Sequence, residues 1–221
     1  MNKLVIKNLR HTYSDGQNEL EVLKGVNAEF QSGKMYAIIG ESGSGKTTLL
    51  SLISALDRIQ EGEILYNGKD VREIGEQVFR LKYANIVFQA FNLIKYMTAR
   101  ENVEVALDFT GRVKNERDAA YELLARVGIK RVEANRLVQK LSGGQQQRAA
   151  IARCIAGNVP IIVADEPTGN LDEKTEEKIL QVLHDLAIKE KKIVIIVTHS
   201  KRVADHADAV IYRMSKGVLK K

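Results

Sequence analysis

The sequence has one cysteine and two prolines in 221 residues, and its apolar runs are short. A single cysteine, Cys154, excludes an internal disulfide and fits a reducing cytoplasm. The scarcity of proline and the 44% hydrophobic content exclude wholesale disorder. A membrane span needs about 20 apolar residues, whereas residues 193–197 form a run of strand length. We therefore expect no membrane span and, because residues 1–7 lack a long apolar stretch, no signal peptide.

Charge of one sign does not dominate the chain either. The 34 basic and 28 acidic residues give a net charge of +6 and an isoelectric point near 9.3. Both signs are interspersed along the sequence, and basic runs are as short as residues 189–192. This pattern is typical of a solvated mixed-charge surface, so the charge alone names no partner.

Segments with strand and helix patterns alternate at both ends of the chain. Strands are predicted at residues 4–6, 22–30, 35–39, 63–66, 160–164 and 193–197, with short edge strands at 208–213 and 218–219. One helix is predicted to begin in the glycine-rich segment after residue 39 and to continue through residue 56, and another is predicted at 173–189. The alternation indicates a parallel α/β core.

The middle of the chain has a different pattern, with apolar residues at helical spacing. Thr98 and Glu101 form a capping box, which predicts a helix through about residue 109. A second amphipathic helix is predicted at residues 115–127. Residues from about 90 to 155 therefore form a predicted helical subdomain inserted into the core.

Residues 40–47 read GESGSGKT and match the phosphate-binding pattern G-x-x-x-x-G-K-[ST] in full. They follow a predicted strand and open a predicted helix, which is the context that this P-loop pattern requires. Its glycines let backbone N–H groups surround a phosphate, and the helix N-terminus adds partial positive charge. Lys46 would neutralise the terminal phosphates, and the Thr47 hydroxyl would hold Mg²⁺. The predicted nucleotide-binding residues are Gly40, Glu41, Ser42, Gly43, Ser44, Gly45, Lys46, Thr47 and Thr48.

Two carboxylates, Asp165 and Glu166, follow the apolar strand of residues 161–164. At the carboxyl end of a strand, both side chains can reach one ligand crevice. We expect Asp165 to orient the hydration shell of Mg²⁺ and Glu166 to polarise an attacking water. The alternative is an acidic turn, which becomes less favoured in a chain that also carries a P-loop.

A second glycine-rich helix start lies at Ser142-Gly143-Gly144-Gln145. Ser142 and Gln145 form a capping box, but this does not explain two glycines that each cost about 1 kcal/mol relative to alanine. Glycine there removes side chains over the helix N-terminus, so an anion can approach the amides. One nucleotide cannot readily use both helix starts of one molecule, whereas a head-to-tail pair of molecules can present both.

With these motifs in this order, the sequence resembles an ABC-transporter ATPase subunit over essentially all 221 residues. The matching motifs are the Walker A segment 40–47, the signature 141–145, the Walker B strand 161–166 and the D-loop 170–172. The resemblance implies an α/β fold of the P-loop NTPase type. A RecA-like parallel-sheet core with an antiparallel β subdomain would cover residues 1–89 and 156–221, with the helical subdomain at about 90–155, in one domain.

The resemblance also implies roles for four further residues. Tyr13 would stack on adenine, Gln89 of the Q-loop would ligate Mg²⁺ and act in catalysis, and His199 would contact the γ-phosphate. Asp172 of the D-loop would contribute to the nucleotide site, and the helix that begins after it makes an N-cap role equally natural. Without the motif set, Tyr13 reads as a core or turn aromatic, Gln89 as a polar strand end and His199 as a loop histidine. ATP and Mg²⁺ are the implied ligands, and a second copy of the chain would complete the site.

Segments 87–93, 141–148 and 164–172 resemble more closely the lipoprotein-release, macrolide-export and bacitracin-resistance subgroup, with the cell-division ATPase as a cousin. The chain departs from the pattern at residues 136–140, which lack a proline, and at Cys154 and Ile155. Residues 91–94 read equally well as subdomain core and as a docking groove for a permease helix.

Two functions follow from the resemblance. The first is a peripheral ATPase on the cytoplasmic face of the membrane, without a nucleic-acid partner, that drives a separate permease and exports or extracts a peptide, lipoprotein or drug-like substrate. The second is a soluble ABC-type ATPase that acts on DNA or ribosomes, or a cell-division ATPase that does not transport. The DNA and ribosome function is less favoured, because DNA-repair relatives carry long coiled-coil or zinc insertions and translation-factor relatives join two ATPase domains. This chain has one P-loop and no such insertion.

Overall fold

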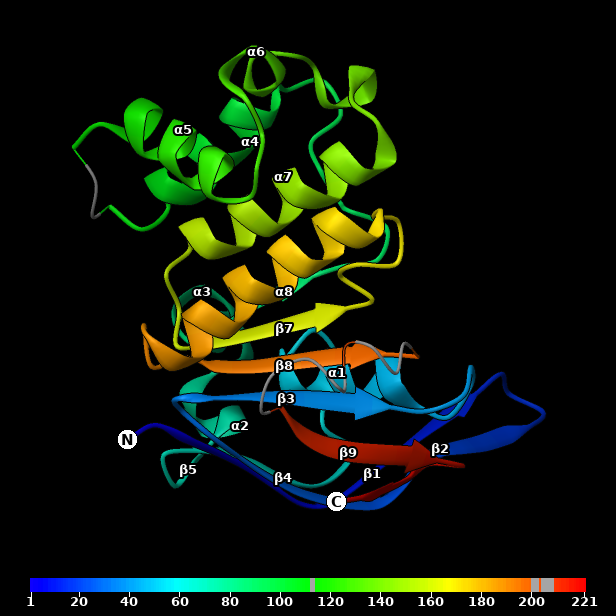
Figure 1. Ribbon diagram of the computed structural model, residues 1–221. Coiled ribbons are helices and arrows are strands. Elements are labelled where there is room, and N and C mark those ends of the chain that lie inside the picture. Colours follow the sequence, from blue (N-terminus) through cyan, green and yellow to red (C-terminus); the bar gives the residue numbers. More distant parts are fainter. Residues whose placement is uncertain (112–113, 200–202, 204–208) are drawn as a thin grey trace.

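The structure is a computed structural model that describes residues 1–111, 114–199, 203 and 209–221 (Figure 1). Its strands are β1 (Lys3–Ser14), β2 (Glu19–Gln31), β3 (Lys34–Ile39), β4 (Glu61–Tyr66), β5 (Lys69–Asp70), β6 (Ala84–Val87), β7 (Ile161–Asp165), β8 (Ile193–Thr198), β9 (Val210–Ser215) and β10 (Val218–Lys220). Its helices are α1 (Lys46–Ile53), α2 (Val71–Ile74), α3 (Glu76–Lys82), α4 (Ala99–Asp108), α5 (Glu116–Arg126), α6 (Arg131–Ala134), the 3₁₀ turn η1 (Val138–Lys140), α7 (Gly143–Ala156) and α8 (Glu173–Ile188).

The central sheet has the strand order β10-β9-β3-β8-β7-β6. All of its neighbouring strands are parallel except β10, which pairs antiparallel with β9. The carboxyl ends of β3, β6, β7 and β8 therefore meet at one edge, which is where ligands bind in open α/β sheets. The expected α/β fold with a parallel core is thus present.

Both faces of this sheet are buried, and β8 shows how the sequence achieves it. Val194 and Ile196 belong to the apolar cluster formed with α4, α5, α7 and α8. Ile193, Ile195 and Val197 belong to the cluster on the opposite face, formed with α1 and the β1–β4 layer. Because strand side chains alternate between faces, a sheet covered on both sides requires an unbroken apolar strand.

A second sheet of β2, β1, β4 and β5 is wholly antiparallel and covers the α1 side of the core (Figure 1). In the β1–β2 register, Tyr13 lies opposite Leu20. This register places Leu20, near the start of β2, beside Tyr13, the residue expected to stack on adenine.

The helical part lies above the central sheet in Figure 1, with α4, α5 and α6 at the far end and α7 beneath them. Both expected capping boxes are present, at Thr98 with Glu101 and at Ser142 with Gln145. Ala120 and Leu124 of α5 are fully buried in the cluster with α4 and α7. The helical middle predicted from the sequence is confirmed at the level of its elements.

Several elements differ from the sequence prediction. Helix α1 ends at Ile53 and not at residue 56, because the Ser54 hydroxyl donates to the Leu50 carbonyl and Ala55 is left-handed, with φ of 55°. Helices α2 and α3 and strand β6 were not predicted, and β1 continues to Ser14, well beyond the predicted residues 4–6. Strand β9 is not an edge strand, because it lies between β3 and β10. Residue 208, the expected first residue of that strand, lies outside the described residues.

No helix in the described part of the chain combines the length and the apolar character that a bilayer crossing requires.

Candidate functional site

A cavity of about 470 Å³ lies at the carboxyl edge of the central sheet. Ten of the residues singled out in the sequence line it, although they come from four separate stretches of the chain. They are Ser42, Gly43, Gly45, Lys46, Thr47, Thr48, Gln89, Asp165, Glu166 and His199. The parallel topology explains this convergence, since each stretch follows a different strand of one sheet.

The loop before α1 exposes backbone amides to this cavity. Gly45 is the N-cap residue of α1, with φ of 104°, and no side chain caps the helix. Among the described residues, the amides of residues 45–48 have no hydrogen-bond acceptor. Gly40 is required for close packing, because a Cβ there would lie 2.2 Å from the Met214 carbonyl oxygen. The result is an open helix N-terminus of the kind that binds phosphate.

Two side chains of the loop test whether it fits a phosphate. The Lys46 ammonium group donates to the carbonyl oxygens of Gly40 and Glu41, at 2.9 and 2.8 Å, although the side chain is nearly buried. Ser44 Oγ is buried without a partner among the described residues. A buried cation, free amides and an unpaired hydroxyl together form a donor set suited to a polyphosphate.

Oxygen atoms for a cation gather on the other side of the cavity. Thr47 Oγ1 donates to Asp165 Oδ2 at 3.2 Å, and Gln89 lines the same cavity. Burial raises the pKa of Asp165, and the neighbouring Glu166 carboxylate adds to the rise. The described residues contain no group of three or more histidine, cysteine or acidic side chains placed to hold a metal. A hydroxyl, an amide and one carboxylate fit Mg²⁺, which usually takes the remaining oxygens from water and phosphates.

Glu166 is the most strongly oriented side chain in the cavity. It is left-handed, with φ of 46°, directly after β7. Oε2 accepts a hydrogen bond from the Thr198 hydroxyl at 2.9 Å, and Oε1 accepts one from the His199 amide at 3.0 Å. The carboxylate is therefore fixed by residues at the end of β8, with its side chain mostly shielded from solvent.

Tyr13 does not line the cavity, but its hydroxyl lies 3.4 Å from Thr48 Oγ1 on α1. The ring is 46% exposed and contacts His11 edge-on, with 4.7 Å between the ring centroids. Leu20 and Val22 of β2 do line the cavity, and the sequence reasoning missed both. The signal that would have found Leu20 is the β1–β2 register, which places it opposite Tyr13.

The signature residues Ser142, Gly143, Gly144 and Gln145 form the start of α7 and do not line this cavity. In the described part of the chain, the amides of Gly143 and Gly144 have no hydrogen-bond acceptor. A Cβ on Gly144 would lie 3.2 Å from Leu171 Cδ2, so glycine lets the loop before α8 pack against the signature. The chain thus presents two separate helix starts with free amides.

Asp172 has a structural role that can be seen directly. It is the N-cap of α8, and its carboxylate accepts hydrogen bonds from the Thr175 amide at 3.1 Å and the Thr175 hydroxyl at 2.7 Å. These bonds lower the pKa of Asp172. The carboxylate is therefore already used within its own helix.

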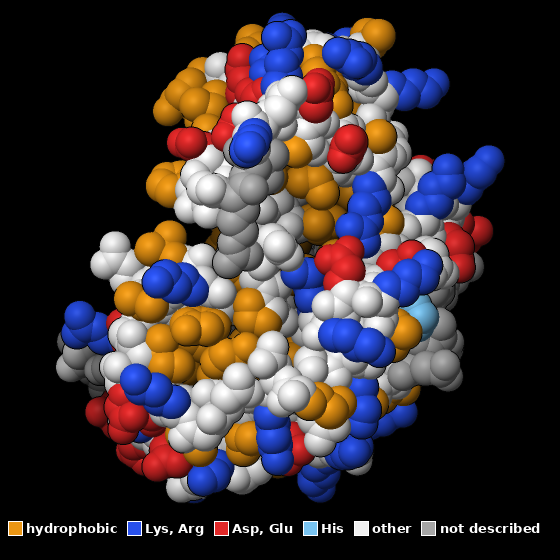
Figure 2. All heavy atoms as spheres, turned by 90° about the vertical axis from the view of Figure 1, so that its left-hand side faces the viewer, with side chains coloured by type: hydrophobic (Ala, Val, Ile, Leu, Met, Phe, Trp, Pro, Cys, Tyr) orange, Lys and Arg blue, Asp and Glu red, His pale blue; other side chains and the backbone are white. Residues whose placement is uncertain are grey.

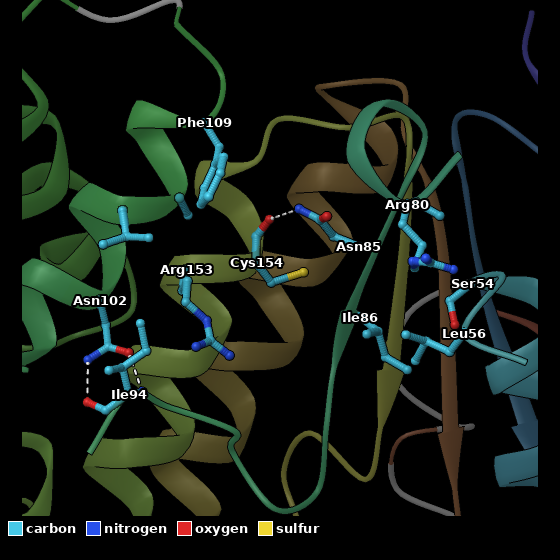
Figure 3. A pocket seen from close by; sticks show the side chains of 13 residues that line it. Ser54, Leu56, Arg80, Asn85, Ile86, Ile94, Asn102, Phe109, Arg153 and Cys154 are labelled. Carbon is cyan, nitrogen blue, oxygen red and sulfur yellow. Dashed lines mark hydrogen bonds between the residues drawn. The ribbon is translucent and has the colours of Figure 1, made fainter. Parts of the chain in front are cut away.

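A second cavity, of about 300 Å³, lies between the central sheet and the helical part. Figure 2 shows the face on which it opens, where hydrophobic side chains gather on both sides of a hollow. Its lining includes the apolar residues Leu56, Ile86, Ile94, Val105 and Phe109 and the cations Arg80 and Arg153, and no acidic residue of the described chain (Figure 3). Phe109 and Leu56 are 80% and 45% exposed. This cavity is therefore an apolar surface with two positive charges.

Comparisons of the sequence and of the structure with known proteins all find ABC-transporter ATP-binding proteins. A profile described as ABC transporter matches residues 23–169. The chain is 51% identical to YclH, an uncharacterized ABC transporter ATP-binding protein of Bacillus subtilis, over 87% of this chain and 85% of that protein. It is 38% identical to the macrolide export ATP-binding/permease protein MacB of Pasteurella multocida, over 93% of this chain and 32% of that protein. A dimeric post-hydrolysis structure of the ATP-binding cassette MJ0796 bound to ADP and Pi superposes with a TM-score of 0.92, at 39% identity, covering 99% of this chain and 97% of that one.

Proposed function

Because this chain belongs to the ABC transporter family as an ATP-binding subunit, we propose that it hydrolyses ATP and powers a separate membrane permease. The observation that carries this proposal is the single cavity where an open helix start, Lys46, Asp165 and Glu166 meet. Hydrolysis of a phosphoanhydride requires hydrogen-bond donors that hold the phosphates and a fixed carboxylate that acts on the attacking water, and the two lie on opposite sides of this cavity.

The residues divide the chemistry between them. The amides of the loop and Lys46 hold the phosphates, and the Tyr13 ring offers a face to the adenine. Thr47, Asp165 and Gln89 would hold Mg²⁺, which neutralises charge on the phosphates when it is bound. Glu166 accepts a proton or a hydrogen bond from the attacking water. His199, with its ring 74% exposed at the cavity, donates to the terminal phosphate.

A second copy of the chain completes the site in this proposal. The signature amides at Gly143 and Gly144 are free but lie outside the cavity of their own chain. A head-to-tail dimer would present them to the terminal phosphate held by the partner's loop. The dimeric state of the MJ0796 cassette, at 39% identity over nearly the whole chain, supports this arrangement.

The second cavity is the proposed docking surface for the permease. Its apolar lining suits an aliphatic or aromatic side chain on a permease helix, and Arg80 and Arg153 suit a carboxylate beside it. Ile94 lies in this lining, whereas Phe91, Asn92 and Leu93 line a neighbouring hollow. The sequence left residues 91–94 open between subdomain core and docking groove. In the structure they line the second cavity and the hollow next to it.

The likeness to MacB supports membership in the subgroup that exports or extracts a peptide, lipoprotein or drug-like molecule. The name of MacB joins ATP binding with a permease, which supports placing the present chain at the cytoplasmic face of a membrane beside a permease. An ABC-type ATPase that acts on DNA or ribosomes, or a cell-division ATPase that does not transport, is the alternative.

Two measurements test the proposed function. Phosphate release by the purified chain with MgATP tests hydrolysis. Co-purification with an integral-membrane protein, compared with salt-dependent retention on nucleic acid, tests the partner. Absence of phosphate release, or retention on nucleic acid that falls steeply with salt, contradicts the proposal.

Phe109→Asp tests the docking surface specifically, because Phe109 lines the second cavity and is exposed. We expect this variant to lose the membrane partner and to keep ATP binding. Val132→Asp is the matched control, since Val132 is 70% exposed on α6 and does not line the cavity. Equal retention of the partner by both variants would remove this cavity from docking.

A further inference from the structure

Gln89 lies in a tight turn that is stabilised by a residue of another element, helix α7. The amide of Phe91 donates to the Phe88 carbonyl oxygen at 3.2 Å, and the amide of Asn92 donates to the Ala90 carbonyl oxygen at 2.7 Å. Gln89 and Ala90 are therefore the central residues of the turn. The position of Gln89 in the nucleotide cavity depends on whether this turn stays closed.

The end of the turn has an unfavourable backbone conformation. Phe91 and Asn92 have φ values of 62° and 48°. The left-handed region is strained for a bulky residue such as phenylalanine, and it persists only where surrounding contacts enforce it. Some contact outside the turn must therefore compensate for this strain.

Arg153 provides that contact from α7. One guanidinium nitrogen donates to the Asn92 carbonyl oxygen at 2.8 Å, and the other donates to the Phe91 carbonyl oxygen at 3.3 Å. Within the described chain no carboxylate lies within 4 Å of this guanidinium. The two carbonyl oxygens of the strained turn are thus the partners of a half-buried cation.

The same turn also contacts the other end of α7. A Cβ on Gly143 would lie 4.0 Å from Phe91 Cζ, so the Phe91 ring lies beside the signature. Arg153 in turn lines the second cavity, where Figure 3 shows its guanidinium between Ile94 and Cys154. The turn therefore contacts the signature helix at both ends. Its Gln89 lines the nucleotide cavity, and its partner Arg153 lines the second cavity.

We propose that Arg153 is a positioning residue for Gln89: it holds the turn of residues 88–92 closed and thereby sets the rate of ATP hydrolysis. The inference rests on the proposed function, because Gln89 acts only if the chain hydrolyses ATP. It also implies that a carboxylate docked in the second cavity competes for the guanidinium and changes the position of Gln89. The Arg153 contact then links the docking surface to the catalytic site.

The test compares Arg153→Met and Arg153→Lys with the wild-type chain. Hydrogen exchange of the Phe91 and Asn92 amides should be about tenfold faster or more in Arg153→Met, since both bonds to the turn are lost. Turnover should fall by about 10-fold to 100-fold, with the ATP dissociation constant within about twofold of wild type. Arg153→Lys should recover part of both changes, because one ammonium group can reach one of the two carbonyl oxygens.

A matched control and a double variant separate positioning from general stability. Arg148 lies on the same helix and donates to the carbonyl oxygens of Val127 and Gly128. Arg148→Met should therefore leave the exchange of the Phe91 and Asn92 amides unchanged. In a Gln89→Ala background, Arg153→Met should change turnover by less than about twofold, because it acts through the missing side chain.

Unchanged exchange at Phe91 and Asn92 in Arg153→Met overturns the inference. Effects of Arg153→Met and Gln89→Ala that multiply, or wild-type turnover in Gln89→Ala, overturn it as well. A wild-type chain that releases no phosphate contradicts the proposed function instead, and the exchange comparison then still decides whether Arg153 holds the turn.

Discussion

The imidazole Nδ1 of His199 lies 2.7 Å from Oε1 of Glu166, and the same carboxylate oxygen accepts the His199 backbone amide. The two residues stand at the ends of neighbouring parallel strands, β7 and β8. His199 therefore orients the carboxylate that we expect to act on water. The Thr198 hydroxyl binds the second oxygen and fixes the plane of the group.

Glu166→Gln tests this carboxylate most directly. Glutamine keeps the shape and the carbonyl acceptor but cannot take a proton, so turnover should slow by about 10²-fold to 10⁴-fold while ATP binding survives. Because the nucleotide would bridge two copies, slow hydrolysis should also trap the dimer. Phosphate release and gel filtration with and without MgATP measure both effects.

Wild-type turnover in Glu166→Gln would remove Glu166 from the mechanism. An inactive variant that stays monomeric with MgATP would keep the catalytic role and contradict nucleotide-driven dimerisation of the isolated chain.

Lys46→Ala should abolish ATP binding or turnover, because the loop loses its buried cation. In the folded wild-type chain this ammonium group contacts only carbonyl oxygens of its own loop among the described residues, so its loss leaves the central sheet intact. Circular dichroism checks the fold, and titration with ATP measures the affinity. Unchanged affinity and turnover in a folded variant would contradict the P-loop assignment.

Ser142→Arg should leave ATP binding to the monomer largely intact and stop hydrolysis. The substitution places a bulky side chain over the free amides of Gly143 and Gly144, which lie outside the cavity of the same chain. Loss of the capping bond from the Gln145 amide to Ser142 Oγ should also cost about 1 kcal/mol of stability.

Ser142→Ala separates the two effects, because it loses the cap without adding bulk. We expect it to show the stability loss, measured as a lower midpoint of urea unfolding, and to retain more activity than Ser142→Arg. Normal hydrolysis by Ser142→Arg would contradict the two-copy site.

Cys154 should be unreactive in the folded chain. Burial raises the pKa of its thiol to about 12, so at pH 8 about one molecule in ten thousand carries the thiolate. Labelling with a disulfide reagent at pH 8 should be slow in buffer and complete in guanidinium chloride. Rapid labelling of the folded chain would contradict the packing of α7 against β6, where Asn85 donates to the Cys154 carbonyl oxygen.

Some features of the molecule follow from the sequence alone because their physics is local. A capping box lies within four consecutive residues, so Thr98 with Glu101 and Ser142 with Gln145 predicted two helix starts. The P-loop pattern likewise specifies a strand, a turn and a helix in consecutive residues. Helix α3 and strand β6 lack such local signals, and packing against the apolar cluster around Phe79 decides them.

The tertiary structure decided which distant residues act together. Leu20 joined the nucleotide cavity only through the β1–β2 register, and Arg153 reached the Gln89 turn only because α7 packs beside β6. Arg153 and Asn92 lie about 60 residues apart in the sequence. No local sequence pattern predicts a contact over that separation. Loop, cap and strand patterns therefore predicted the chemistry, whereas long-range packing determined the contacts that orient it.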